Sequence, residues 1–164
     1  MTTNSLSNLT IDESRLTATY VRVFDAPRDL VFQVYADPKL IPQWWGPAKY
    51  TTIVETLDFR PGGKWRFTQV GPDGDEHAFN GEFREINPPE SVVYTFEYEG
   101  APGHIMVETM TFEALGDKTR ITAVDSFASL EDLQGMFQDG MEEGANESFD
   151  RFAELLKRIQ RAEH

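Results

Sequence analysis

A chain of 164 residues can bury one substantial hydrophobic core but is short for two domains. Its 40% hydrophobic and 26% charged residues, with 12 Phe, exclude intrinsically disordered and fibrous proteins. The net charge of −13, from 15 basic and 28 acidic residues, repels phosphate backbones and anionic headgroups, so we expect neither nucleic acid nor membrane as a partner.

The first residues, 1–14, are rich in Thr, Ser and Asn, which predicts a flexible N-terminal arm ahead of a single domain over 15–162. This arm has neither the cationic start nor the apolar run of a signal peptide. A strand is predicted over 17–24, and a helix over 28–35 because a proline fits its first turn.

A second short helix is predicted to start at 37–38 (Asp-Pro) and to end at 44–47 (Trp-Trp-Gly-Pro). The two tryptophans would form either a gate over a cavity or a plug at one end of the core. Beyond this point the hydrophobic period changes to two, the period of strands. Turn signals rich in Gly, Pro, Asn and Asp delimit six predicted strands at 51–59, 64–70, 76–86, 91–99, 104–115 and 118–127.

The chain closes with helices, one predicted from a capping start at Ser129 and a long one over 139–160. Apolar residues of the long helix recur every three or four positions, which predicts one buried stripe formed by Met141, Ala145, Phe149, Phe152, Leu156 and Ile159. Gly140 and Gly144 lie on or beside this stripe, either for close contact with a sheet or to leave space for a bound molecule.

This order of elements predicts an α+β fold, with a seven-stranded curved antiparallel sheet wrapped around the long C-terminal helix and two short helices between strands one and two. A hairpin register that sets Ile86 opposite Ser91 places Phe83 opposite Tyr94, and the aromatic side chains then share one face. That register also sets Gly81 opposite Phe96 and Phe79 opposite Tyr98. The aromatic face is either a plain core or a ligand pocket, and Gly81 favours the pocket because a missing side chain leaves room.

This order resembles the helix-grip fold shared by birch-pollen-allergen-like, START and polyketide-cyclase proteins, the SRPBCC superfamily. Local motifs are similar to the branch named after the activator of the heat-shock chaperone ATPase. These motifs are Arg22-x-Phe24-x-Ala26-Pro27, Val31-Phe32, Asp37-Pro38, Trp44-Trp45-Gly46-Pro47, Pro61-Gly62-Gly63-Lys64-Trp65, Gly81-x-Phe83-x-Glu85-Ile86-x-Pro88-Pro89 and Thr119-Arg120-Ile121-Thr122.

The resemblance covers about residues 16–160 and implies the helix-grip fold with a cavity between sheet and helix. Two departures from the family pattern stand out. Members of this branch often carry an aromatic residue where this chain has Met141, which implies a different pocket shape. The chaperone activator also has a separate large domain that a 16-residue arm cannot replace, so a chaperone partner is disfavoured.

The last hairpin brings two carboxylates together. A two-residue turn at Gly116-Asp117 sets Glu108 directly opposite Asp125 on an otherwise apolar face. Burial and mutual repulsion would raise a carboxyl pKa there, making one group a proton donor or a ligand anchor. The alternatives are a register slip that leaves one carboxylate in water, or neutralisation by Arg or Tyr.

We therefore expect a cytoplasmic, monomeric or homodimeric protein that binds a small apolar or aromatic molecule in a lipid-binding-like cavity. The alternatives are a cyclase- or dehydratase-type enzyme, with Glu108 and Asp125 as its candidate catalytic residues, and a stress-related co-chaperone-like interaction module. No cofactor is expected, and no metal, since cysteine is absent and His77, His104 and His164 share no ligand spacing. The candidate ligand-binding residues are Trp45, Trp65, Phe67, Phe79, Phe83, Tyr94, Phe96, Glu108, Met110, Asp125, Met141, Ala145 and Phe149.

Overall fold

The computed structural model describes residues 8–138 and 141–162. In chain order its elements are β1 (Asn8–Asp12), β2 (Thr17–Phe24), α1 (Arg28–Ala36), the 3₁₀ helix η1 (Ile41–Gln43), β3 (Thr51–Leu57), β4 (Lys64–Val70), β5 (Glu76–Asn87), β6 (Ser91–Tyr98), β7 (Met106–Leu115), β8 (Lys118–Ser126), α2 (Leu130–Gln138) and α3 (Met141–Ala162).

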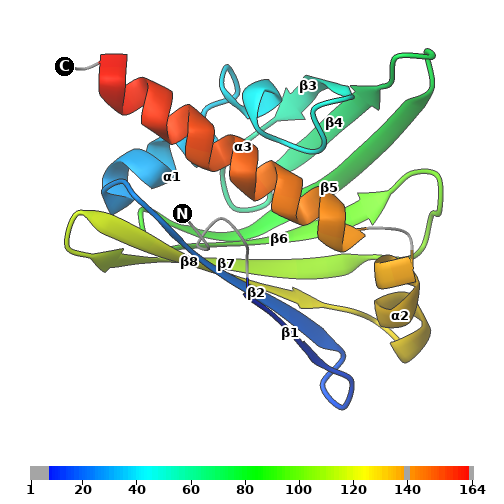
Figure 1. Cartoon of the computed structure of the whole chain (residues 1–164). Coiled ribbons are helices and arrows are strands. Elements are labelled where there is room, and N and C mark those ends of the chain that lie inside the picture. Colours follow the sequence, from blue (N-terminus) through cyan, green and yellow to red (C-terminus); the bar gives the residue numbers. More distant parts are fainter. Residues whose placement is uncertain (1–7, 139–140, 163–164) are drawn as a thin grey trace.

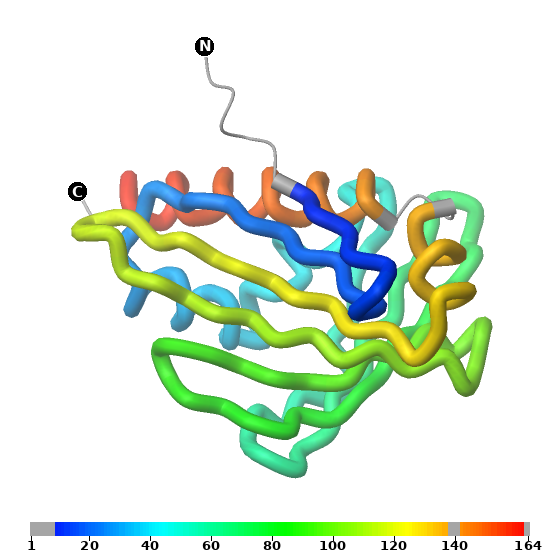
Figure 2. Tube along the Cα trace, turned by 90° about the horizontal axis from the view of Figure 1, so that it is seen from below, coloured from blue at the N-terminus to red at the C-terminus, as the bar shows by residue number. Residues whose placement is uncertain are grey.

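One sheet of eight strands, in the order β1-β2-β8-β7-β6-β5-β4-β3, forms the body of the protein, and each neighbouring pair is antiparallel. The sheet curls, and α3 crosses its open side diagonally while α1 lies at one end of the curl (Figure 1). Seen from below, the strands wrap around the space under α3 (Figure 2). The prediction of an α+β fold with a curved sheet gripping the C-terminal helix is confirmed.

The sheet contains one strand more than predicted. Residues 8–12, expected to belong to a flexible arm, form β1 and pair with β2 from Asn8 opposite Val21 to Asp12 opposite Thr17. The polar composition of this segment hid the strand, because its pairing depends on backbone hydrogen bonds to the free edge of β2 and Leu9 is its contact with the core. Residues 1–7 lie outside the described part of the chain.

The second predicted helix is also shorter than expected, since only η1 is helical between α1 and β3. The carboxylate of Asp37 accepts a hydrogen bond from the backbone N–H of Lys39 at 2.9 Å, which forms a turn before the helix starts. Trp44 ends η1 and is 9% exposed in the core.

The predicted register of the last hairpin is confirmed from Leu115 opposite Lys118 to Glu108 opposite Asp125. The register of the β5–β6 hairpin is wrong at its turn, where Ile86 pairs with Val92 rather than Ser91. A bulge between Phe83 and Glu85 absorbs the one-residue shift, so the predicted pairs of Phe83 with Tyr94 and Phe79 with Tyr98 are present.

Gly81 serves a different purpose from the one the sequence favoured. The indole Nε1 of Trp65 donates a buried hydrogen bond of 3.1 Å to the Thr95 carbonyl oxygen, and this ring fills the space beside Gly81. A Cβ at position 81 would lie 1.8 Å from that carbonyl oxygen and 2.4 Å from the indole nitrogen. The missing side chain therefore makes room for Trp65 and not for a ligand.

This contact predicts the effect of adding one methyl group. Gly81→Ala is expected to lower the free energy of unfolding by about 1–3 kcal/mol, because the strand backbone or Trp65 must move. Gly135→Ala in α2 is the matched control, since its new Cβ would meet no atom within 4 Å and alanine favours the helix by about 0.5–1 kcal/mol. Urea unfolding of both variants measures the difference, and equal stability of the two would contradict it.

Candidate functional site

A polar row crosses the concave face of the sheet between apolar rows. Tyr94 on β6 pairs with Glu108 on β7, and Glu108 pairs with Asp125 on β8. The flanking rows are apolar, with Met106 opposite Phe96 on one side and Met110 between Val92 and Ala123 on the other. Two carboxyl groups are thus held face to face on an apolar surface by strand pairing alone.

The hydrogen bonds of this row are incomplete. The Tyr94 hydroxyl donates to Oε1 of Glu108, so the tyrosine satisfies one carboxylate of the pair. Asp125 is 8% exposed, and its Oδ1 is buried without a hydrogen-bond partner. Burial, and then the charge of Glu108, raise the pKa of Asp125 well above its ordinary value. A protonated Asp125 can donate a hydrogen bond beside an acceptor, Glu108.

Two further tyrosines surround the row, and the sequence analysis did not select either. Burial, then the charges of Asp125 and Glu108, raise the pKa of Tyr20 on β2. Burial and Glu108 likewise raise the pKa of Tyr35 on α1. The alternation along β2 places Tyr20 on the inner face and could have identified it, whereas Tyr35 reaches the sheet through the tertiary position of α1.

The concave face is sealed near α1, where the inner residues Phe24, Phe112 and Ile121 are 1–2% exposed. Toward α2, Met106, Phe127 and Leu133 are buried in a second apolar cluster. The inward-facing aromatic residues that keep part of their surface in solvent, although they pack on the core, are Trp45, Phe79, Tyr94, Phe96 and Phe149. Solvent therefore reaches these rings, while Oδ1 of Asp125 is buried.

Most of the predicted lining residues come together. Trp45 contacts the rings of Trp65, Phe67 and Phe79 at 5.2–6.4 Å. Phe96 joins the same aromatic group, Trp65 links it to Tyr94, and Tyr94 contacts Phe83. Trp65, Phe67, Phe83 and Met110 are buried. These four form the packed floor beneath the partly exposed rings.

The helix contributes the opposite wall. Phe149 lies 6.3 Å from Tyr20 and 6.0 Å from Phe24, and Ala145 is half-buried. A Cβ at Gly144 would meet no atom within 4 Å outside the nearby helix backbone, so close contact with the sheet does not explain this glycine. Gly140 and the side chain of Met141 lie outside what the structure describes, and the prediction for Met141 stays a prediction.

The segment around Trp44 and Trp45 is fastened to α3, which favours the plug over the gate. Ser148 Oγ donates to the Trp44 carbonyl at 3.1 Å and accepts from the Gly46 N–H at 2.6 Å. Arg151 donates to the Gly46 carbonyl at 2.6 Å. Gly46 has φ +78°, and a Cβ there would lie 1.8 Å from Gln69 Nε2, so glycine is required.

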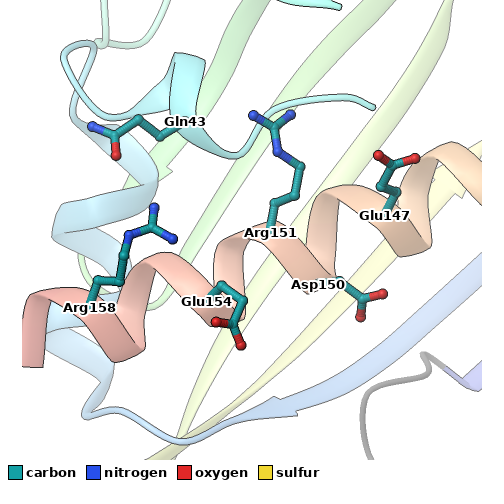
Figure 3. A pocket seen from close by; sticks show the side chains of 6 residues that line it. All are labelled: Gln43, Glu147, Asp150, Arg151, Glu154 and Arg158. Atoms are coloured by element: carbon teal, nitrogen blue, oxygen red, sulfur yellow. The ribbon is translucent and has the colours of Figure 1, made fainter. Parts of the chain in front are cut away.

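Among the described residues two surface hollows stand out, and neither is lined by the predicted ligand-binding residues other than through α3 itself. One, of about 310 Å³, follows α3, with Arg151 and Arg158 directed toward the segment that carries Gln43 (Figure 3). Its other lining residues are Glu147, Asp150 and Glu154. The second, of about 440 Å³, lies between β1 and α2. Arg151 donates to the backbone carbonyls of Gly46 and Pro42, which leaves few of its N–H groups for a ligand in the first hollow.

Within the described ranges, no three His, Asp or Glu side chains are grouped so as to hold a metal ion. Over the same residues, no helix is long and apolar enough to cross a membrane.

Comparisons with known proteins agree on one family. The model of the family described as "Activator of Hsp90 ATPase homolog 1-like protein" matches residues 25–157. A solution structure of a protein from Arthrobacter aurescens is 30% identical, with a TM-score of 0.86, and the match covers 92% of this chain and 91% of that one. Protein Ms6760 from Mycobacterium smegmatis is also 30% identical, with a TM-score of 0.83 and coverage of 91% and 95%.

More distant matches show the fold alone. DynU16, from the dynemicin biosynthetic locus, is 19% identical with a TM-score of 0.65, and the match covers 87% of this chain and 47% of DynU16. A search of curated proteins gave no significant match.

Proposed function

We propose that the concave face of this protein, which belongs to the family of Activator of Hsp90 ATPase homolog 1-like proteins, binds a small, largely apolar or aromatic molecule. The ligand would lie against the partly exposed rings of Phe79, Tyr94 and Phe96, with Phe149 on the helix side. The family fold, which it shares with a protein of a biosynthetic locus, supports a ligand-binding or cyclase-like role in general terms.

The observation that carries this proposal is the buried carboxyl pair of Asp125 and Glu108, in which Oδ1 of Asp125 has no hydrogen-bond partner outside the pair. Leaving a buried acceptor unsatisfied costs about 1–3 kcal/mol, and a packed core has no need of such a group. A ligand with a polar group directed at Asp125 would supply the missing hydrogen bond. The remaining apolar part of the ligand would cover aromatic surface that is now reached by solvent.

Uptake of a fluorescent probe tests the proposal directly. Anilinonaphthalene sulfonate should bind the folded protein and quench tryptophan emission through Trp45 and Trp65. Ala145→Trp adds a large side chain to the helix wall, and we expect it to weaken probe binding by about tenfold or more, equivalent to about 1.4 kcal/mol.

Ala162→Trp, at the exposed end of the same helix, is the control and should bind as the unmodified protein does. Thermal unfolding confirms that both variants are folded before binding is measured. No uptake by the folded protein, or equal uptake by the two variants, would leave a plain aromatic core as the better interpretation.

An enzyme that uses the carboxyl pair is the second candidate function, favoured by the raised pKa of Asp125 next to Glu108. The substitution Glu108→Gln distinguishes the ligand-binding role of the pair from the catalytic role. If the pair anchors ligand, the change lowers affinity; if it transfers a proton, affinity is kept and turnover of a substrate is lost. The chaperone named in the family description is a third candidate partner.

A further inference from the structure

A second polar group lies on the inner face at the rim, away from the carboxyl pair. His77 on β5 is held on both ring nitrogens, with Nδ1 2.8 Å from the Tyr98 hydroxyl and Nε2 3.0 Å from Oδ2 of Asp75. The Tyr50 ring packs edge-on against the imidazole at 5.5 Å. Three side chains from two strands and a turn thus form one chain of hydrogen bonds.

The direction of the protons follows from the chemistry of the end groups. A carboxylate only accepts, so Nε2 of His77 must carry the hydrogen that Asp75 accepts. In a neutral imidazole Nδ1 is then an acceptor, and the Tyr98 hydroxyl must donate to it. The Tyr98 oxygen is left with free lone pairs and no proton to offer, which makes it an acceptor toward any third group.

Two glycines accommodate this arrangement. A Cβ at Gly71 would lie 2.1 Å from Oδ1 of Asp75, and one at Gly100 would lie 2.5 Å from the ring of Tyr98. A side chain at either position would displace a member of the chain. The sequence therefore makes room for both ends of the hydrogen-bonded group.

Tyr98 also adjoins the proposed ligand surface. Its ring lies 5.2 Å from Phe79 and is partly exposed. It shares the inner face of β6 with Tyr94 and Phe96, four residues beyond Tyr94, or about 13 Å along the strand. A ligand that rests on Phe79 and Phe96 would present its rim-side edge to the Tyr98 oxygen.

We propose that Tyr98, polarised by His77 and Asp75, is a specificity-determining residue that accepts a hydrogen bond from a hydroxyl group of the ligand. The inference rests on the proposed binding function and narrows the ligand to a phenol, an enol or a similar hydroxyl-bearing aromatic molecule. A ligand in which an ether replaces the hydroxyl has no proton to donate and leaves the Tyr98 oxygen unpaired.

A pair of probes that differ in one hydrogen-bond donor tests this inference. We expect 2-naphthol to bind about three- to tenfold more tightly than 2-methoxynaphthalene at about pH 8, measured by tryptophan quenching. Because both probes meet the same apolar surface, their affinity ratio isolates the contribution of the hydroxyl group.

Substitutions in the hydrogen-bonded group of Asp75, His77 and Tyr98 show which residue causes the preference for the hydroxyl-bearing probe. Tyr98→Phe should abolish the preference for 2-naphthol, and Asp75→Asn should weaken it because an amide can pair with either tautomer of His77. Asp73→Asn, an exposed residue in the same turn, is the control and should keep the full preference. If these hydrogen bonds serve only to hold β5 and β6 together, the substitutions would change stability but not the affinity ratio of the two probes.

The outcomes separate the two proposals. If both probes bind with equal affinity, the proposed role of Tyr98 is wrong and the binding function stands. If neither probe binds the folded protein, both are wrong. A preference that survives in Tyr98→Phe would assign the selectivity to another residue and overturn the inference.

Discussion

Replacing Phe152 by alanine is expected to lower the free energy of unfolding by about 3–5 kcal/mol. The side chain is 2% exposed and makes edge-on contacts with Phe24 at 5.3 Å and Trp44 at 5.0 Å. These rings belong to the sheet and to the segment after η1, so Phe152 joins three parts of the core. Removing it leaves a cavity that fixed strands cannot fill. Chemical denaturation at equilibrium measures the loss.

Phe149→Ala, one turn earlier on α3, is the matched comparison. Phe149 is only partly buried, so the stability loss should be clearly smaller. The same change should weaken uptake of anilinonaphthalene sulfonate, because Phe149 is a partly exposed ring on the helix side of the proposed site and contacts Tyr20. Equal stability losses in the two variants would mean that side chains fill the whole space between α3 and the concave face.

Asp125→Asn is expected to stabilise the protein at neutral pH by about 1–3 kcal/mol. Burial and Glu108 raise the pKa of Asp125 in the folded state. Between the ordinary carboxyl pKa and this raised pKa, the folded protein binds more protons than the unfolded chain, so stability falls as pH rises. Asparagine cannot ionise, and its amide can donate to Glu108, so the variant should lose this part of the pH dependence.

Unfolding free energies measured from about pH 4 to pH 8 test the sign of this effect. Asp117→Asn, in the exposed turn of the same hairpin, is the control and should leave the pH profile unchanged. A loss of stability at neutral pH in Asp125→Asn would show that the ionised carboxylate is compensated in the fold, against the present interpretation. If Asp125 anchors ligand, the stabilised variant should also bind the probe less tightly.

Sequence alone determined the elements whose signal is local. The two-residue turn at Gly116-Asp117 fixed the register of β7 and β8, and with it the encounter of Glu108 and Asp125, because strand pairing propagates from the turn without interruption. The apolar stripe of α3 likewise identified Phe152 and Leu156 as buried core. Both follow from periodicity within one continuous segment.

Tertiary structure decided the features that depend on distant segments. β1 exists because β2 offers an unpaired edge, and Gly81 is needed because Trp65, from another strand, crosses it to reach Thr95. Tyr35 comes near Glu108 only because α1 packs against the curled sheet. No local pattern encodes these contacts, because they arise from the curvature of eight strands and the packing of helices against them.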